Sequence, residues 1–166
     1  MKLGKVSVGC LCVCIFGFAM YSLADEENAF TKAIASADRI VVRDGGFDCC
    51  RPVAKDKILF VVTNSVEIAM IKSNFRFPEN AYQGACMCCG WPGIDWYEGN
   101  KRLALTAVQH GVNLRWSGFA PPRKPFQKQA RYGDAALTKE SQAWLKEWLE
   151  SHGLKWIETE GRKPKD

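Results

Sequence analysis

Three segments of the chain repeat their apolar residues every three to four positions, the spacing of one face of an α-helix. The first covers residues 25–37. The second begins after Asn64, which has Glu67 three residues later in the pattern of a capping box. The third covers 138–153 and is the clearest, because tryptophans and leucines share one face and a glycine stands at its end. We therefore predict three helices.

Four other segments have the alternating or continuous apolar character of strands, namely residues 39–44, 57–63, 94–108 and 112–116. The third contains Gly99-Asn100, a pair suited to a two-residue hairpin turn. Residues 57–63 are apolar nearly throughout, which indicates a central strand covered on both faces. Strands joined by hairpins, with helices between the pairs, predict an α+β fold. We expect an antiparallel sheet of four to five strands with helices packed on one face.

The first 24 residues are typical of an export signal. A short basic start leads into a long uncharged run, and small residues precede the acidic segment that follows Ala24. We predict cleavage there, leaving a single α+β domain over residues 25–160 and a polar tail over 161–166. The alternative is an uncleaved N-terminal helix that anchors the protein, because the run is long enough to cross a bilayer core of roughly 30 Å. In both cases the domain is exported, periplasmic or secreted, and faces an oxidising space.

Composition and charge narrow the classes of function. A chain of 166 residues that is 47% hydrophobic can form one domain with its own core. The formal net charge of +5 falls to +3 when Lys2 and Lys5 leave with the signal. So mild a charge does not indicate nucleic-acid binding. The sequence also has no glycine-rich phosphate loop, so a nucleotide site has no support.

Five of the eight cysteines lie beyond the signal, in two groups that are expected to occupy loops: Cys49, Cys50, Cys86, Cys88 and Cys89. In an oxidising compartment disulfides are the favoured interpretation. Directly adjacent cysteines rarely bridge, because their side chains must span a restricted range of Cα separations. We therefore predict bonds between the two loops. An odd number of cysteines leaves at least one of them unpaired, liganded or intermolecular.

The same cysteines offer two other chemistries. Cys86, Cys88 and His110, with Cys49 or Cys50 from the first loop, could bind zinc or copper as a thiophilic ion. Alternatively, Cys86 and Cys89 have the Cys-x-x-Cys spacing of redox pairs, although Cys88 interrupts it. The simpler interpretation of His110 is a turn residue before a glycine, and we favour it.

Aromatic and basic residues around the second cysteine group define a candidate binding surface: Trp91, Trp96, Trp116, Arg115, Arg123 and Lys124. For the tryptophans, packing in the core is the favoured interpretation, because aromatic side chains bury large areas. The basic loop 115–131 could contact an envelope protein or an anionic surface. A solvated surface loop is the favoured alternative.

The second half of the chain resembles a group of uncharacterised small exported bacterial proteins. The resemblance depends on a Cys-x-Cys loop with a glycine, a His-Gly pair, an Arg-Trp pair and a C-terminal helix rich in tryptophan or leucine. In this sequence the motif residues are Cys86, Cys88, Gly90, His110, Gly111, Arg115 and Trp116. The resemblance implies no particular activity. Cys89 and the basic loop look like additions to the pattern, which implies that Cys89 is the odd thiol.

Three functions follow from these observations. The leading one is an exported, non-catalytic binding or structural module of the cell envelope, cross-linked by disulfides. The first alternative is a thiol-rich protein that binds copper or zinc, and the second is a thiol redox enzyme. The ligand, the disulfide connectivity and the oligomeric state cannot be inferred from the sequence.

Overall fold

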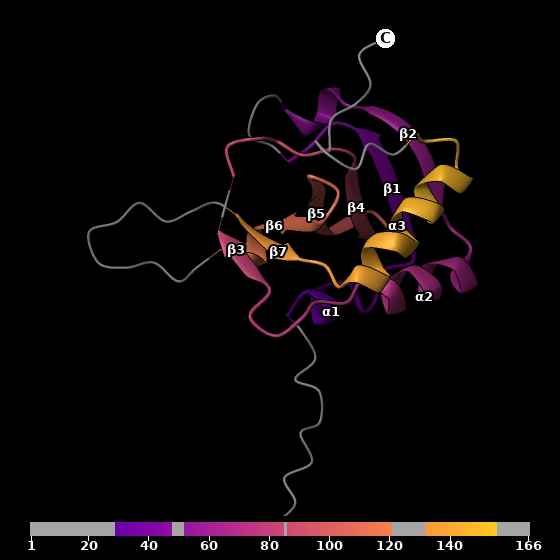
Figure 1. Ribbon diagram of the computed structural model, residues 1–166. Coiled ribbons are helices and arrows are strands. Elements are labelled where there is room, and N and C mark those ends of the chain that lie inside the picture. The colour runs from indigo at the N-terminus through magenta and orange to yellow at the C-terminus, as the bar shows by residue number, and fades with distance from the viewer. Residues whose placement is uncertain (1–28, 48–51, 85, 121–131, 156–166) are drawn as a thin grey trace, which may run out of the picture.

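The computed structural model describes residues 29–47, 52–84, 86–120 and 132–155. They form an antiparallel seven-stranded sheet in the order β2-β1-β4-β5-β6-β7-β3 (Figure 1). The strands are β1 (Arg39–Asp44), β2 (Lys57–Val62), β3 (Tyr82–Gly84), β4 (Gly93–Glu98), β5 (Lys101–Gln109), β6 (Asn113–Trp116) and β7 (Gly133–Ala136). The α+β class and the antiparallel sheet are confirmed. The sheet is larger than predicted, because the short strands β3 and β7 carry no alternating apolar pattern.

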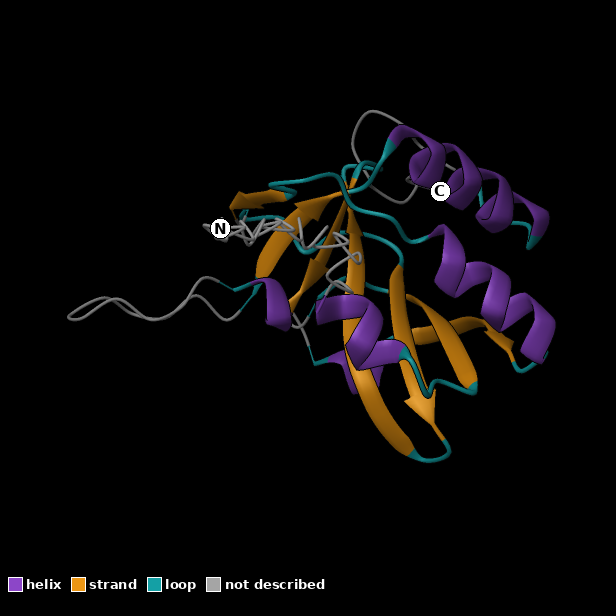
Figure 2. Ribbon diagram, turned by 90° about the horizontal axis from the view of Figure 1, so that it is seen from below, coloured by secondary structure: helices purple, strands orange, loops and turns teal. Residues whose placement is uncertain are grey.

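Three helices pack on one face of the sheet: α1 (Ala29–Ile34), α2 (Ser65–Asn74) and α3 (Lys139–Ser151). The two longer helices, α2 and α3, lie side by side (Figures 1 and 2). The buried apolar side chains of all three helices form one core with alternate residues of the strands, including Ile40, Val42, Ile94, Trp96 and Leu114. The core lies against one face of the sheet. The two cysteine-bearing loops lie over the other face.

The two longer helices begin at side-chain caps. Asn64 accepts hydrogen bonds from the backbone N–H groups of two residues in the first turn of α2, both at 3.0 Å. Thr138 caps α3 in the same way through Ser141. Gly153, with a φ of 78°, follows the end of α3, where its conformation suits a glycine. Glu67 does not complete the capping box, because it accepts a hydrogen bond from Trp148 of α3.

The prediction that residues 57–63 form a central strand is wrong. β2 pairs only with β1 and lies at an edge of the sheet. Ile58 is 58% exposed and Val61 is 46% exposed. The apolar run correctly predicts a strand. Its place in the sheet depends on pairing, because β4 pairs with the other side of β1 and leaves β2 at the edge. A continuous apolar run therefore does not identify a central strand here.

The face of the sheet turned away from the helices carries buried polar residues, which is unusual for a strand surface. They are Arg43, Asp95, Gln109, Arg115 and Asp134. Two loops cover this face, one after β1 and one before β4. They meet where the backbone N–H of Phe47 donates to the carbonyl of Cys89 at 2.7 Å. The described ends of the two cysteine-bearing loops are therefore in contact.

No helix within the four described ranges is long and apolar enough to cross a membrane. The predicted export signal, residues 1–24, and the predicted polar tail, residues 161–166, lie outside those ranges. The first predicted helix, 25–37, is shorter than expected where it is described, since α1 ends at Ile34 and a turn follows.

Candidate metal centre

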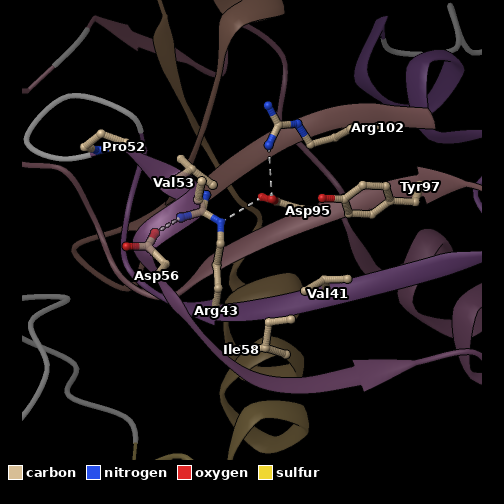
Figure 3. A pocket seen from close by; sticks show the side chains of 10 residues that line it. Val41, Arg43, Pro52, Val53, Asp56, Ile58, Asp95, Tyr97 and Arg102 are labelled. Atoms are coloured by element: carbon tan, nitrogen blue, oxygen red, sulfur yellow. Dashed lines mark hydrogen bonds and ion pairs between the residues drawn. The ribbon is translucent and has the colours of Figure 1, made fainter. Parts of the chain in front are cut away.

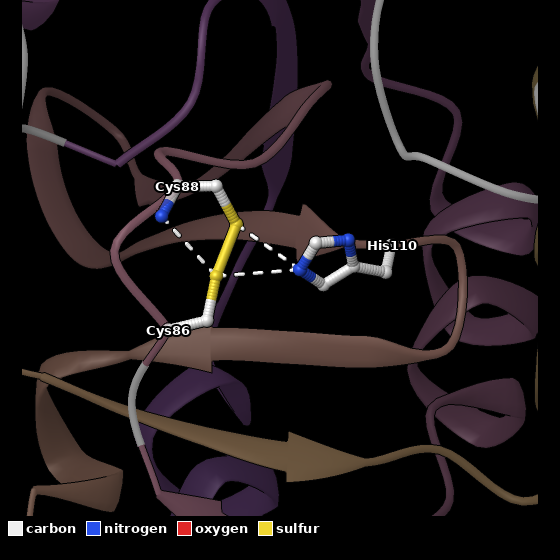
Figure 4. Close-up of side chains that lie close together, drawn as sticks. All are labelled: Cys86, Cys88 and His110. Carbon is white, nitrogen blue, oxygen red and sulfur yellow. Dashed lines mark hydrogen bonds between the residues drawn. A yellow bond between two sulfur atoms is a disulfide. The ribbon is translucent and has the colours of Figure 1, made fainter.

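Cys86, Cys88 and His110 converge at one end of the sheet (Figure 4). The Nε2 atom of His110 lies 3.3 Å from Sγ of Cys86 and 3.2 Å from Sγ of Cys88. All three donor atoms lie within 4.8 Å of one another. The two sulfurs are joined as a disulfide, with the Cα atoms 5.6 Å apart. Both cysteines are half-buried, and His110 lies on the solvent side.

A buried ion pair holds the backbone of both cysteines in place. Arg115 on β6 is fully buried and donates two hydrogen bonds to Asp134 on β7, at 2.6 and 2.8 Å. Its guanidinium also donates to the carbonyls of Cys88 and, at 2.8 Å, of Cys86. Asp134 in turn accepts the backbone N–H of Cys86 at 3.0 Å. The loop is therefore bonded to two neighbouring strands through charged groups, which form stronger hydrogen bonds than neutral ones.

Gln109, at the end of β5, supports the inner side of the site. It is fully buried, and its Oε1 atom lies 2.8 Å from Sγ of Cys88. The loop can approach this side chain only because residue 90 is a glycine. A Cβ atom at Gly90 would lie 2.4 Å from Nε2 of Gln109, and its φ of 75° also favours glycine.

A tight turn between β5 and β6 carries His110. The backbone N–H of Val112 donates to the carbonyl of Gln109 at 3.0 Å and closes the turn. The two central residues, His110 and Gly111, have φ values of 52° and 74°, the signature of a type I′ turn. Positive φ is uncommon for a residue other than glycine. His110 is thus the predicted turn residue, and its imidazole also reaches the two sulfurs.

A second group of charges lies under the loop after β1 and lines a cavity of about 520 Å³ (Figure 3). Arg43 bridges Asp56 at 2.6 Å and Asp95 at 3.1 Å, and all three side chains are almost fully buried. The half-exposed Arg102 lies 3.7 Å from Asp95 at the rim. Burial raises the pKa of Asp95 above its ordinary value, against the opposing effect of Arg43. The cavity is thus lined by two arginines and two carboxylates that pair with one another.

Asp95 gives a prediction for pH dependence. Because its pKa is raised in the folded protein, the folded state retains a proton at pH values where the unfolded chain, with a pKa near 3.8, has lost it. Its contribution to stability is therefore greatest below that value and falls as the pH rises through the folded pKa. We expect Asp95→Asn, which cannot ionise, to remove this fall when urea unfolding is measured at successive pH values. The same pH dependence in both proteins would contradict the assignment.

The described residues of the predicted binding surface are buried or packed against the core, as the favoured interpretation of the tryptophans predicted. Trp96 and Arg115 are fully buried, and Trp91 is 8% exposed. Trp116 packs against the core, where it meets the ring of Phe30. Trp96 and Trp116 belong to the core on the helix side of the sheet, whereas Arg115 is buried on the other face under the cysteine loop. Arg123 and Lys124 lie outside the described residues.

The cysteine predictions have a mixed outcome. Cys86 and Cys88 bond each other, so the second group can supply at most one of the predicted bonds between the loops, through Cys89. One intervening residue allows their Cα atoms a separation that a disulfide can span. Cys89 is also disulfide-bonded, so it is not the odd thiol. Cys49 and Cys50 lie outside the described residues, so bonding between the loops and a metal-ligand role for Cys49 stay predictions.

Two residues of the site, Gln109 and Asp134, were not predicted from the sequence. The one sequence signal for Gln109 is that it directly precedes His110. Asp134 follows an irregular segment, and nothing in its surroundings indicates that it pairs with Arg115.

Comparison with protein-family models, curated proteins and solved structures gave no match to this chain. The resemblance to small exported bacterial proteins therefore stays an expectation.

Proposed function

We propose that this protein is exported and that, with Cys86 and Cys88 reduced, it binds one thiophilic metal ion through these two sulfurs and His110. One observation carries the proposal: a single imidazole nitrogen lies almost equally close to both sulfurs. A single metal ion bound by all three atoms requires the nitrogen to lie at similar distances from the two sulfurs. In a tetrahedral zinc site, bond lengths of about 2.3 Å to sulfur and about 2.0 Å to nitrogen separate the donors by roughly 3.5 Å. The observed separations of 3.2 and 3.3 Å are close to this value.

The donor set favours copper(I) over zinc. Once the Cys86–Cys88 disulfide is reduced, the site supplies two thiolates and one imidazole, and soft sulfur ligands select copper(I). Zinc in a structural site requires a fourth ligand. Cys49 is the predicted source of that ligand, and water is the alternative. Both ions are therefore included in the test, and copper(I) is expected to bind more tightly.

The burial of the aromatic residues weakens the rival function, a non-catalytic binding module. Its contact surface was expected to include Trp91, Trp96 and Arg115, which are inside the protein. What is left of that hypothesis is the basic loop 115–131, of which residues 121–131 lie outside the described ranges. Docking of an envelope protein or an anionic surface there stays a prediction. Three of the four ligands of the metal hypothesis, in contrast, have their donor atoms within 4.8 Å of one another.

Metal titration of the chemically reduced protein under anaerobic conditions tests the proposal. We expect one copper(I) ion per chain, measured against a competing chromophoric chelator, and no uptake by Cys86→Ser/Cys88→Ser. His110→Gly removes the imidazole but keeps the positive φ that the turn requires. We expect this variant to bind copper(I) at least about tenfold more weakly. Mutating a residue that only orients a metal ligand already lowers affinity about tenfold, and loss of a ligand should cost no less.

His152→Gly is the matched control, because this histidine lies at the end of α3, away from the cysteines. It should bind copper(I) as the wild type does. Melting temperatures of both histidine variants show whether they are folded. Unchanged affinity in a folded His110→Gly protein would exclude the three-donor site.

A further inference from the structure

The two sulfurs proposed as metal ligands are bonded to each other in the structure. A metal ion needs thiolates, so the disulfide and the ion exclude one another. We propose that the Cys86–Cys88 pair undergoes thiol–disulfide exchange with an external dithiol, and that this exchange opens and closes the metal site. The inference depends on the proposed metal function for its second part. The exchange reaction itself depends only on the cysteine pair.

The residues around the pair allow both states with one backbone conformation. The Cα separation of 5.6 Å is within the normal range for a disulfide. In a tetrahedral site with bonds of about 2.3 Å, two thiolates lie roughly 3.8 Å apart, so the sulfurs need only separate by side-chain rotation. Arg115 and Asp134 bind the carbonyls and N–H of this loop, and none of these bonds involves a sulfur. These bonds therefore stay intact when the disulfide breaks.

The pair is open to an attacking thiol from one side. Met87, between the two cysteines, is 94% exposed, so the loop lies at the surface. Gln109 and Arg115 are fully buried and occupy the inner side. An incoming dithiol must therefore approach from the solvent side, where His110 also lies.

The hydrogen bonds indicate which sulfur is attacked. The backbone N–H of Cys88 donates to Sγ of Cys86 at 3.2 Å, which stabilises negative charge on that atom. The side-chain amide oxygen of Gln109 lies 2.8 Å from Sγ of Cys88 and 3.8 Å from Sγ of Cys86, so it disfavours negative charge more on Cys88. The external thiolate therefore attacks Sγ of Cys88, and the sulfur of Cys86 leaves as the thiolate.

The second half of the reaction completes the balance. The attack leaves a mixed disulfide between the external molecule and Cys88. The second thiol of the external molecule then attacks its own bonded sulfur, and Cys88 is released. Two electrons pass from the external dithiol to the pair, the external molecule becomes a disulfide, and its two protons pass to the new thiols or to solvent.

Equilibration of the metal-free protein with mixtures of reduced and oxidised dithiothreitol tests the exchange. After acid quenching and alkylation, mass mapping should show Cys86 and Cys88 reduced together as one two-electron couple. With glutathione, a monothiol, the mixed disulfide should accumulate on Cys88 while Cys86 is alkylated. Copper(I) should bind to the reduced protein and not to the oxidised one, a change of at least about a hundredfold in affinity.

The outcomes separate this inference from the proposed function. If the pair stays oxidised at every ratio, or the oxidised protein binds copper(I) as tightly as the reduced one, the inference is wrong. Glutathione located on Cys86 would overturn the assigned direction of attack. If the pair exchanges but protein reduced with a phosphine binds no ion, the proposed function fails and the exchange activity stands.

Discussion

Arg115→Met is expected to destabilise the protein by about 3–5 kcal/mol, the usual effect of removing one partner of a buried ion pair. Arg115 is fully buried, and methionine replaces most of its length without its charge. The substitution leaves the carboxylate of Asp134 buried without its cation. It also removes the donors from the carbonyls of Cys86 and Cys88. The free energy of unfolding from urea titration measures the loss.

Arg102→Met is the matched control for this prediction. Arg102 also pairs with an aspartate, but it is 44% exposed and lies 3.7 Å from Asp95. A pair whose cation is half-exposed contributes little, about 1 kcal/mol, and Asp95 keeps its buried partner Arg43, so this variant should be close to the wild type. Arg115→Met/Asp134→Asn should recover part of the loss, because no unpaired charge is buried. Equal stability of Arg115→Met and Arg102→Met would show that the buried pair does not support the cysteine loop.

Trp148→Ala is the second large effect that we expect, again about 3–5 kcal/mol, typical of deleting a buried aromatic side chain. Trp148 is 5% exposed and lies between α3 and the rest of the core. Its ring lies 5.5 Å from that of Phe60 on β2 and stacks at 5.7 Å on Trp144. Its indole N–H donates to Glu67 of α2 at 3.0 Å. The substitution removes contacts with both neighbouring elements.

Trp148→Phe distinguishes the packing from the hydrogen bond. Phenylalanine keeps an aromatic ring against Phe60 but loses the bond to Glu67, so we expect a smaller loss of about 1–2 kcal/mol, part of it from the smaller ring. Thermal unfolding of the three proteins gives the order wild type, Trp148→Phe and Trp148→Ala. A melting temperature of Trp148→Ala near that of the wild type would mean that α3 does not pack on α2 and β2 as described.

Local chemistry explains why much of the secondary structure was predictable. Asn64 and Thr138 cap helices through their own side chains, and Gly99-Asn100 forms a hairpin turn between adjacent strands. Each cap or turn depends on only a few consecutive residues, so a short stretch of sequence contains all the residues that form it. Trp148 and Leu149 follow Leu145 by three and four residues, the spacing of one helix face, and all three are buried.

Of the candidate site, only the three candidate ligands were predictable. Cys86, Cys88 and His110 were singled out by residue type, but their spacing along the chain does not require them to lie close together. Their distances depend on the turn at His110–Gly111 and on the pairing of β5 with β6. Arg115 was assigned to a surface, because an arginine between apolar residues on a strand normally faces solvent. A loop far along the chain covers that face here.

The sequence by itself determined the helices, the hairpins, the antiparallel class and the list of candidate ligands, because each depends on neighbours within a few residues. Only the tertiary structure decided the strand order, the burial of Arg115 with Asp134 and the bond between Cys86 and Cys88. These features depend on which distant segments pair and which loop covers the outer face of the sheet. Many pairings satisfy the same local pattern, and the packing of the whole chain selects among them.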